Sequence, residues 1–152
     1  MTTVAASRTE MAADSKVVDD GDTFYRGCKL YVIRDAIIGL AGDGNGYAKF
    51  LMWFREGEPE ARPDFVKGDG NWSALVLRES GLFRYYESLV PEPIHEPHYA
   101  IGTGGSGAIV AMRLGKTPAE AVEIMCDVDN NTGRPVTVVR LCDVKPKRRA
   151  RK

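Results

Sequence analysis

A helical repeat in the middle of the chain restricts the fold more than any other feature. Apolar side chains recur at the spacing of one helix face, at Tyr47, Phe50, Leu51 and Phe54. This pattern predicts a helix over residues 45–56 that ends at Gly57. Residues 57–70 contain several prolines and glycines and are expected to form a loop.

Short apolar runs on both sides of this helix predict strands. They cover residues 3–6, 11–14, 29–33, 36–41, 73–78, 82–86, 99–103 and 136–141. Residues 17–27 include Asp19, Asp20, Gly21 and Asp22, a composition that predicts a loop, and prolines make residues 91–97 an extended connection.

Two more helices are predicted near the C-terminal end, over residues 106–113 and 117–127. The second begins with a capping box, in which Thr117 is the N-cap, Pro118 the first helical residue and Glu120 the third. The order is then strands, a helix, strands, two helices and a strand. Because every apolar face must be buried, we expect one domain with two stacked sheets and helices on the outside.

Composition excludes several classes of protein. Lys plus Arg equals Asp plus Glu at 21 each, so the overall charge indicates no particular partner. The sequence has no run of about 18 apolar residues, the length needed to span a membrane. Cys28, Cys126 and Cys142 are scattered, as is typical of free thiols in the cytoplasm. Residues 145–152 read KPKRRARK, for which we expect a disordered basic tail rather than a nucleic-acid-binding segment.

The sequence gives little support for histidine as a catalytic base or a metal ligand. The only histidines, His95 and His98, lie in the proline-rich connection, where with Glu96 they are expected to form a surface loop rather than a metal site. A hydrolase without a placed histidine needs another base. The α-amino group of an N-terminal threonine, with a pKa near 8, is one option, and removal of Met1 would expose Thr2.

Six short segments, taken in order, resemble those of proteasome β subunits and of the peptidase of the HslUV system. They are TTVAAS (2–7), MAADS (11–15), KLYVI (29–33), GLAGDG (39–44), AIGTGG (100–105) and DNNTG (129–133). The resemblance runs from residue 2 to about residue 141. It implies an N-terminal-nucleophile hydrolase domain over residues 2–144, an α+β protein folded as a four-layer αββα sandwich. One helix of the usual family pattern is missing between residues 57 and 70.

The same resemblance assigns a role to individual residues. Thr2 would be the nucleophile with its own amine as base, Lys29 a nearby cation, and Asp14 the partner that orients Lys29. The Gly42 N–H would stabilise the oxyanion, and Thr103, Asp129 and Thr132 would hold the Thr2 amine; Thr103 stands where a serine is usual. The pocket for the residue before the scissile bond would be lined by small or apolar residues, which favours cleavage after apolar residues: Val17, Gly27, Tyr31, Leu40, Gly44 and Ala48.

The expected function is therefore that of a threonine peptidase acting on peptides or unfolded proteins within a homo-oligomer, with an AAA+ unfoldase as a candidate partner. No cofactor is expected, and no metal beyond a structural cation near Asp129. Two alternatives remain open. One is an amidase of the same superfamily acting on a small amide, and the other is a catalytically silent scaffold subunit.

Overall fold

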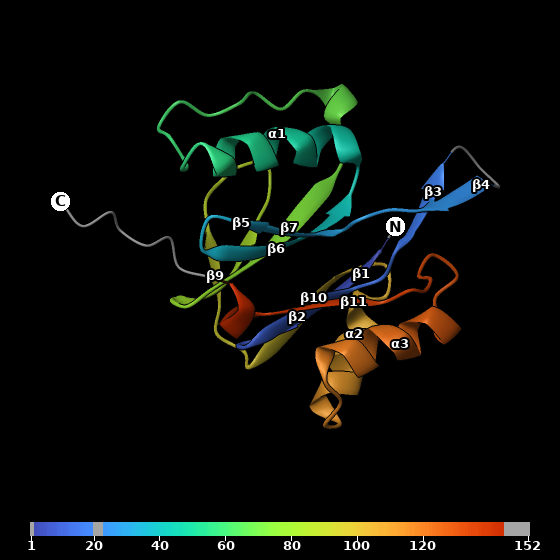
Figure 1. Cartoon of the computed structure of the whole chain (residues 1–152). Coiled ribbons are helices and arrows are strands. Elements are labelled where there is room, and N and C mark those ends of the chain that lie inside the picture. The colour runs from blue at the N-terminus through green and yellow to red at the C-terminus, as the bar shows by residue number, and fades with distance from the viewer. Residues whose placement is uncertain (1, 20–22, 145–152) are drawn as a thin grey trace.

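Two antiparallel sheets stack face to face at the centre of the molecule, and helices cover both outer faces (Figure 1). The computed structural model describes residues 2–19 and 23–144, so the expected basic tail at 145–152 lies outside the described residues. The layers confirm the αββα arrangement.

The first sheet carries the N-terminal strand at its centre. Its order is β10 (His98–Gly102), β1 (Thr3–Ser7), β2 (Glu10–Ala13) and β11 (Thr137–Arg140). Side chains alternate along β1, so that Val4 and Ala6 face the other sheet while Ala5 faces the helices. The outer face is covered by α2 (Gly105–Arg113) and α3 (Pro118–Val128). The small alanine side chains of this face let both helices pack closely against β1.

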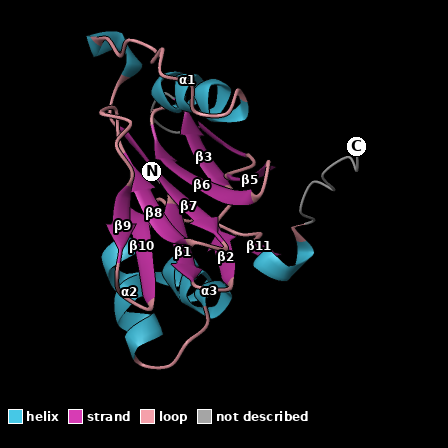
Figure 2. Ribbon diagram, turned by 90° about the vertical axis from the view of Figure 1, so that its left-hand side faces the viewer, coloured by secondary structure: helices cyan, strands magenta, loops and turns pink. Residues whose placement is uncertain are grey.

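The second sheet packs against α1 (Gly44–Arg55), as Figure 2 shows from the side. Its order is β5 (Leu30–Ile33), β6 (Ala36–Gly42), β7 (Trp72–Arg78), β8 (Gly81–Tyr85) and β9 (Glu92–Ile94). Phe50 of α1 is fully buried, with its ring centroid 5.2 Å from those of Trp72 and Tyr85. Between α1 and β7 the chain forms only a short 3₁₀ turn, Lys67–Asp69, so the predicted absence of a second helix there is confirmed.

The prediction of a loop over residues 17–27 was wrong. Residues Lys16–Asp19 form β3 and Thr23–Arg26 form β4, and the two pair as a hairpin that projects from the body (Figure 1). The aspartates and Gly21 dominate the composition of this segment, whereas Val17, Val18, Phe24 and Tyr25 favour strands. The three helices agree with the predicted ones to within about two residues at each end.

The capping box of α3 gives a testable prediction about stability. The Thr117 hydroxyl accepts a hydrogen bond from the Glu120 main-chain N–H at 3.2 Å, and the Glu120 carboxylate accepts one from the Thr117 N–H at 3.1 Å. Thr117→Ala should lower the free energy of unfolding by about 1 kcal/mol in urea denaturation, because an N-terminal N–H of the helix loses its partner. Thr117→Ser keeps the hydroxyl and should be nearly neutral; equal losses in the two variants would show that the cap does not stabilise α3.

Candidate active site

The carboxylate of Asp14 is the centre of the first polar network at the end of the sandwich. Asp14 follows β2, is fully buried, and accepts hydrogen bonds from four separate segments of the chain. Oδ1 accepts from Lys29 Nζ at 2.8 Å and from the Thr3 N–H at 3.0 Å, and Oδ2 accepts from the Lys16 N–H at 3.1 Å and the Gly133 N–H at 3.0 Å. These bonds hold β1, β3, the residue before β5 and the loop after α3 in one arrangement.

Lys29 occupies an unusual electrostatic position for a lysine. It precedes β5, is 7% exposed, and donates from Nζ to Asp14 and to the main-chain carbonyl of Lys16. Burial lowers the pKa of the Lys29 amine, and the hydrogen bond and charge of Asp14 offset only part of this effect. A cation with a lowered pKa is suited to act on the protonation of a neighbouring hydroxyl or amine.

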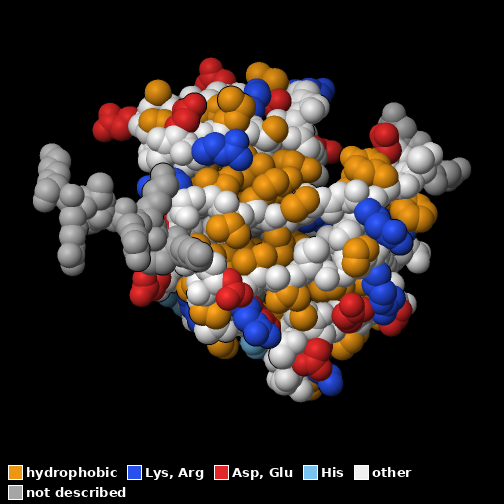
Figure 3. Space-filling model, in the orientation of Figure 1, with side chains coloured by type: hydrophobic (Ala, Val, Ile, Leu, Met, Phe, Trp, Pro, Cys, Tyr) orange, Lys and Arg blue, Asp and Glu red, His pale blue; other side chains and the backbone are white. Residues whose placement is uncertain are grey.

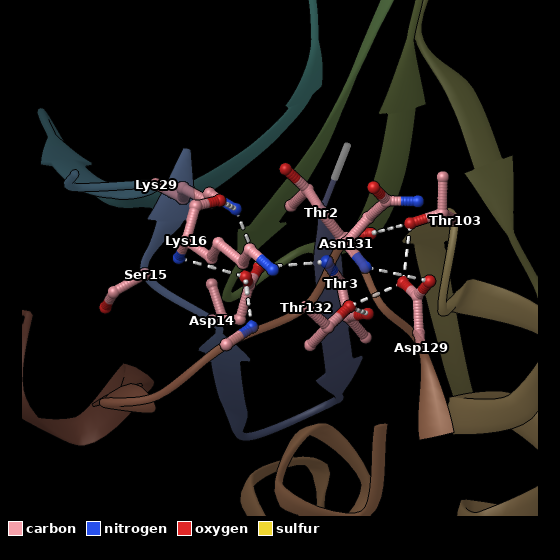
Figure 4. A network of polar contacts seen from close by, with 12 residues as sticks. Thr2, Thr3, Asp14, Ser15, Lys16, Lys29, Thr103, Asp129, Asn131 and Thr132 are labelled. Atoms are coloured by element: carbon pink, nitrogen blue, oxygen red, sulfur yellow. Dashed lines mark hydrogen bonds and ion pairs between the residues drawn. The ribbon is translucent and has the colours of Figure 1, made fainter. Parts of the chain in front are cut away.

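A second network lies on the other side of Thr2 (Figure 4). Asp129 Oδ2 accepts hydrogen bonds from the hydroxyls of Thr103 and Thr132, each at 2.6 Å. Because the single hydroxyl proton of Thr132 goes to Asp129, the Thr3 hydroxyl must be the donor in its 2.6 Å bond to Thr132. Burial raises the pKa of Asp129, but the hydrogen bonds from Thr103, Thr132 and the Asn131 N–H together contribute to a net lowering, so the carboxylate is charged.

Thr2 precedes β1 between these two networks, and the glycine-rich turn after β10 lies against its backbone. Gly102 has a φ of +93°, and a Cβ atom there would collide with the carbonyl oxygen of Thr2. A Cβ atom on Gly104 would collide with the hydroxyl of Thr3. The two glycines therefore allow the turn to approach the N-terminal strand closely enough for Thr103 to reach Asp129.

A cavity of about 500 Å³ opens beside Thr2. Gly42, at the end of β6, lines it together with Thr2 and Thr103. Its φ of +103° and its contact with the backbone at Asn71 and Trp72 explain why a glycine occupies this position. The full lining consists of Thr2, Ala41, Gly42, Gly70, Asn71, Trp72, Ser73, Tyr86, Glu87, Gly102 and Thr103.

No protein-family model matches the sequence, and no curated protein matches it. Solved structures do match. HslV from Trypanosoma brucei superimposes with a TM-score of 0.70 at 20% identity, covering 91% of this chain and 98% of that one. Anbu, the ancestral β-subunit, from Yersinia bercovieri gives 0.69 at 14% identity over 92% and 81% of the two chains. BPH from Thiobacillus denitrificans, in complex with epoxomicin, gives 0.67 at 13% identity over 95% and 99%.

The chain has the HslV and proteasome type of fold. This agrees with the resemblance of the six sequence segments. Within the fold, Thr2, Gly42 and Thr103 line the cavity, while Asp14, Lys29, Asp129 and Thr132 form the two networks beside it. The structure thus brings all seven predicted catalytic residues to one end of the sandwich. Threonine in place of serine at 103 keeps its hydrogen bond to Asp129 despite the extra methyl group.

None of the six residues predicted for the substrate pocket lines this cavity. Their places are Val17 on β3, Gly27 after β4, Tyr31 on β5, Leu40 on β6, and Gly44 and Ala48 on α1. The side chain of Leu40 is buried beneath α1, and the Tyr31 hydroxyl donates to the Cys28 carbonyl at 3.2 Å. Their role in substrate binding remains a prediction.

Sequence reasoning missed part of the site. Thr3 contributes its N–H to Asp14 and its hydroxyl to Thr132, and Trp72, Tyr86 and Glu87 line the cavity. The doubled threonine of TTVAAS is a weak signal for Thr3. The sequence around the other three has no motif, because they reach the site only through strand pairing. A cation near Asp129 would need main-chain carbonyls, since the described residues hold no cluster of three His, Cys, Asp or Glu side chains suited to a metal.

The Asp14 network predicts unequal effects for its two charged members. Asp14→Asn leaves the buried Lys29 amine without its carboxylate and should lower the free energy of unfolding by about 3–5 kcal/mol. Lys29→Met leaves Asp14 with three main-chain N–H donors and should lower it by only about 1.5–3 kcal/mol. Urea denaturation of both variants checks this order; an equal or larger loss for Lys29→Met would contradict the view that Asp14 is the centre of the network.

Proposed function

We propose that this chain is a threonine peptidase whose nucleophile is Thr2 after removal of Met1. The observation that carries the proposal is the position of Thr2. It lies on the wall of a cavity shared with Gly42, between a buried lysine–aspartate pair and a charged aspartate network. An N-terminal threonine carries both a nucleophilic hydroxyl and, in its α-amine, the base that histidine supplies elsewhere.

The proposed reaction begins when the Thr2 amine takes the proton of the Thr2 hydroxyl. The oxygen attacks the peptide carbonyl, and the Gly42 N–H donates to the oxyanion that forms. The C–N bond then breaks, and the leaving amine takes the proton from the Thr2 ammonium group. Water hydrolyses the remaining ester in the reverse sense, with the amine again acting as base.

The two networks have complementary roles in this proposal. Lys29 supplies positive charge that favours the deprotonated state of the Thr2 groups, and Asp14 positions Lys29. Asp129 is negatively charged and reaches the N-terminal strand through Thr132 and Thr3, so it would stabilise the Thr2 amine while that amine holds a proton. Thr103 completes this side of the site.

The expected substrates are peptides or unfolded proteins, and an AAA+ unfoldase would be needed to deliver folded ones. The three free cysteines support a cytoplasmic location. None of the described helices is long and apolar enough to cross a membrane. An amidase acting on a small amide would use the same chemistry, and a panel of peptides and small amides would separate the two activities.

Intact mass before and after treatment with epoxomicin tests the nucleophile directly. BPH has been solved in complex with this compound, which makes it the appropriate probe. We expect loss of Met1 and one adduct on the wild-type protein, none on Thr2→Ala, and an adduct on Thr2→Ser, which keeps the hydroxyl. Retained Met1, or a trimmed protein that forms no adduct, would reject the peptidase proposal and favour a silent scaffold subunit.

The peptidase is further proposed to work as a homo-oligomer, because the projecting β3–β4 hairpin and the edge strand β5 expose large apolar side chains. Phe24 and Tyr25 on the projecting β3–β4 hairpin are 63% and 56% exposed, and Val32 on the edge strand β5 is 52% exposed. Figure 3 shows apolar side chains across the middle of this face and at the hairpin, with charged groups above and below. Exposed apolar surface of this kind marks interaction sites.

Replacing both aromatic residues of the hairpin should weaken self-association. Phe24→Ser with Tyr25→Ser is expected to shift the protein toward smaller species in light scattering after gel filtration. Replacing Val110 on α2 and Leu114 directly after it, which are 58% and 79% exposed, by serine should leave the mass unchanged. A monomeric wild-type protein, or an unchanged mass in the hairpin variant, would contradict the proposed interface.

A further inference from the structure

The cavity extends well beyond the nucleophile. From Thr2 and Gly42 it continues to a wall built by the start of β7 and by the two residues that follow β8. This wall contains Asn71, Trp72, Ser73, Tyr86 and Glu87. Nothing in the proposed chemistry uses these side chains, and of the two aromatic residues Trp72 has a place in the core under α1, so Tyr86 and Glu87 are the ones to consider for a substrate.

The position of the wall indicates which part of a substrate it would meet. The residues predicted to bind the side chain before the scissile bond come from β3, β5, β6 and α1, and none of them lines the cavity. If a peptide carbonyl lies between Thr2 and Gly42 with its acyl side in that predicted pocket, the leaving side must point the other way. The cavity then receives the residue after the scissile bond. This step rests on the proposed function.

The wall has the chemistry of a site for a long cationic side chain. Tyr86 is partly exposed and offers aromatic surface on which the methylene groups of lysine or arginine can pack, whereas the Trp72 ring is buried against α1. Glu87 is the only charged residue among the described residues that line the cavity, and its side chain is exposed. No ion pair between described residues includes Glu87, so its carboxylate is available to a ligand.

A neighbouring cation does not neutralise this carboxylate. Arg84 lies over the ring of Tyr86, with its guanidinium carbon 4.2 Å from the ring centroid, and it donates to the Tyr99 hydroxyl at 2.9 Å. Arg84 does not line the cavity. It therefore supports the Tyr86 ring from one face and leaves Glu87 as the charge that an incoming residue meets.

We propose that Glu87, with Tyr86, selects substrates that have lysine or arginine directly after the scissile bond. The carboxylate forms an ion pair with the cationic head group, while the Tyr86 ring contacts its stem. Glu87 is thus a specificity-determining residue on the leaving-group side of the site. Because the carboxylate is exposed, its effect is modest, about two- to fivefold in binding or in kcat/KM.

A binding experiment tests this without any catalysis. The Thr2→Ala protein is titrated with two labelled peptides that have leucine before the tested position and arginine or glutamine at it, followed by fluorescence anisotropy. The arginine peptide should bind about two- to fivefold more tightly, and this difference should shrink at high salt. Adding Glu87→Gln should remove the preference, and Glu87→Lys should reverse it toward a glutamate peptide.

Glu79→Gln is the matched control, because it removes another exposed carboxylate, from the turn between β7 and β8 outside the cavity. It should leave the preference unchanged. Equal binding of the two peptides, binding of neither, or an equal response to the Glu79 and Glu87 substitutions would overturn the proposal. Digestion of casein by the wild-type protein, with the cut sites read by mass spectrometry, adds a catalytic readout. If no digestion occurs, the peptidase proposal fails while the binding result still decides the role of Glu87.

Discussion

The buried charge of Asp14 is the interaction on which the rest of this end of the sandwich depends. A carboxylate taken out of water is destabilising unless hydrogen bonds and an opposite charge replace its hydration. Asp14 meets this requirement only when Thr3, Lys16, Lys29 and Gly133 lie around it together. These residues lie in β1, in β3, directly before β5 and in a loop near the C-terminal end. The correct placement of these four segments is therefore a condition for satisfying one side chain.

Close packing of the N-terminal strand makes the same end rigid. Alanines on the outer face of the first sheet allow α2 and α3 to lie near β1, and Gly102 and Gly104 let the following turn touch the Thr2 and Thr3 backbone. Larger side chains at these positions would push the turn away and separate Thr103 from Asp129. The position of Thr2 is consequently set by packing on one side and by the Asp14 hydrogen bonds on the other.

The electrostatics of the site follow from its unequal burial. Lys29 is enclosed and its pKa falls, whereas Asp129 keeps a lowered pKa because two hydroxyls donate to it. Thr2 thus lies between the Lys29 amine, whose pKa is lowered, and the negatively charged Asp129 carboxylate. The cavity beyond it has an exposed carboxylate, Glu87, next to Tyr86. In the proposed peptidase, Lys29 and Asp129 would support the reaction at Thr2, and Glu87 would select the substrate.

Local sequence determined most of the elements of this protein. The helical period of residues 45–56, the capping box at Thr117 and the alternation in TTVAAS act over a few residues, and each predicted its element correctly. The resemblance of six short segments also named the seven residues that meet at one end of the sandwich. The hairpin over residues 16–26 was missed because its acidic connection dominated the composition, although its flanks favour strands.

Tertiary structure alone decided what those residues meet. The donors to Asp14 lie up to 119 positions from it along the chain, so no local pattern could bring all four of them to it. The same holds for the cavity wall, where Trp72 and Glu87 reach Thr2 only because β7 pairs with β6 and β8 pairs with β7. Periodicity, caps and motifs record interactions between near neighbours, while buried charges and cavities depend on distances between strands that only the packed fold establishes.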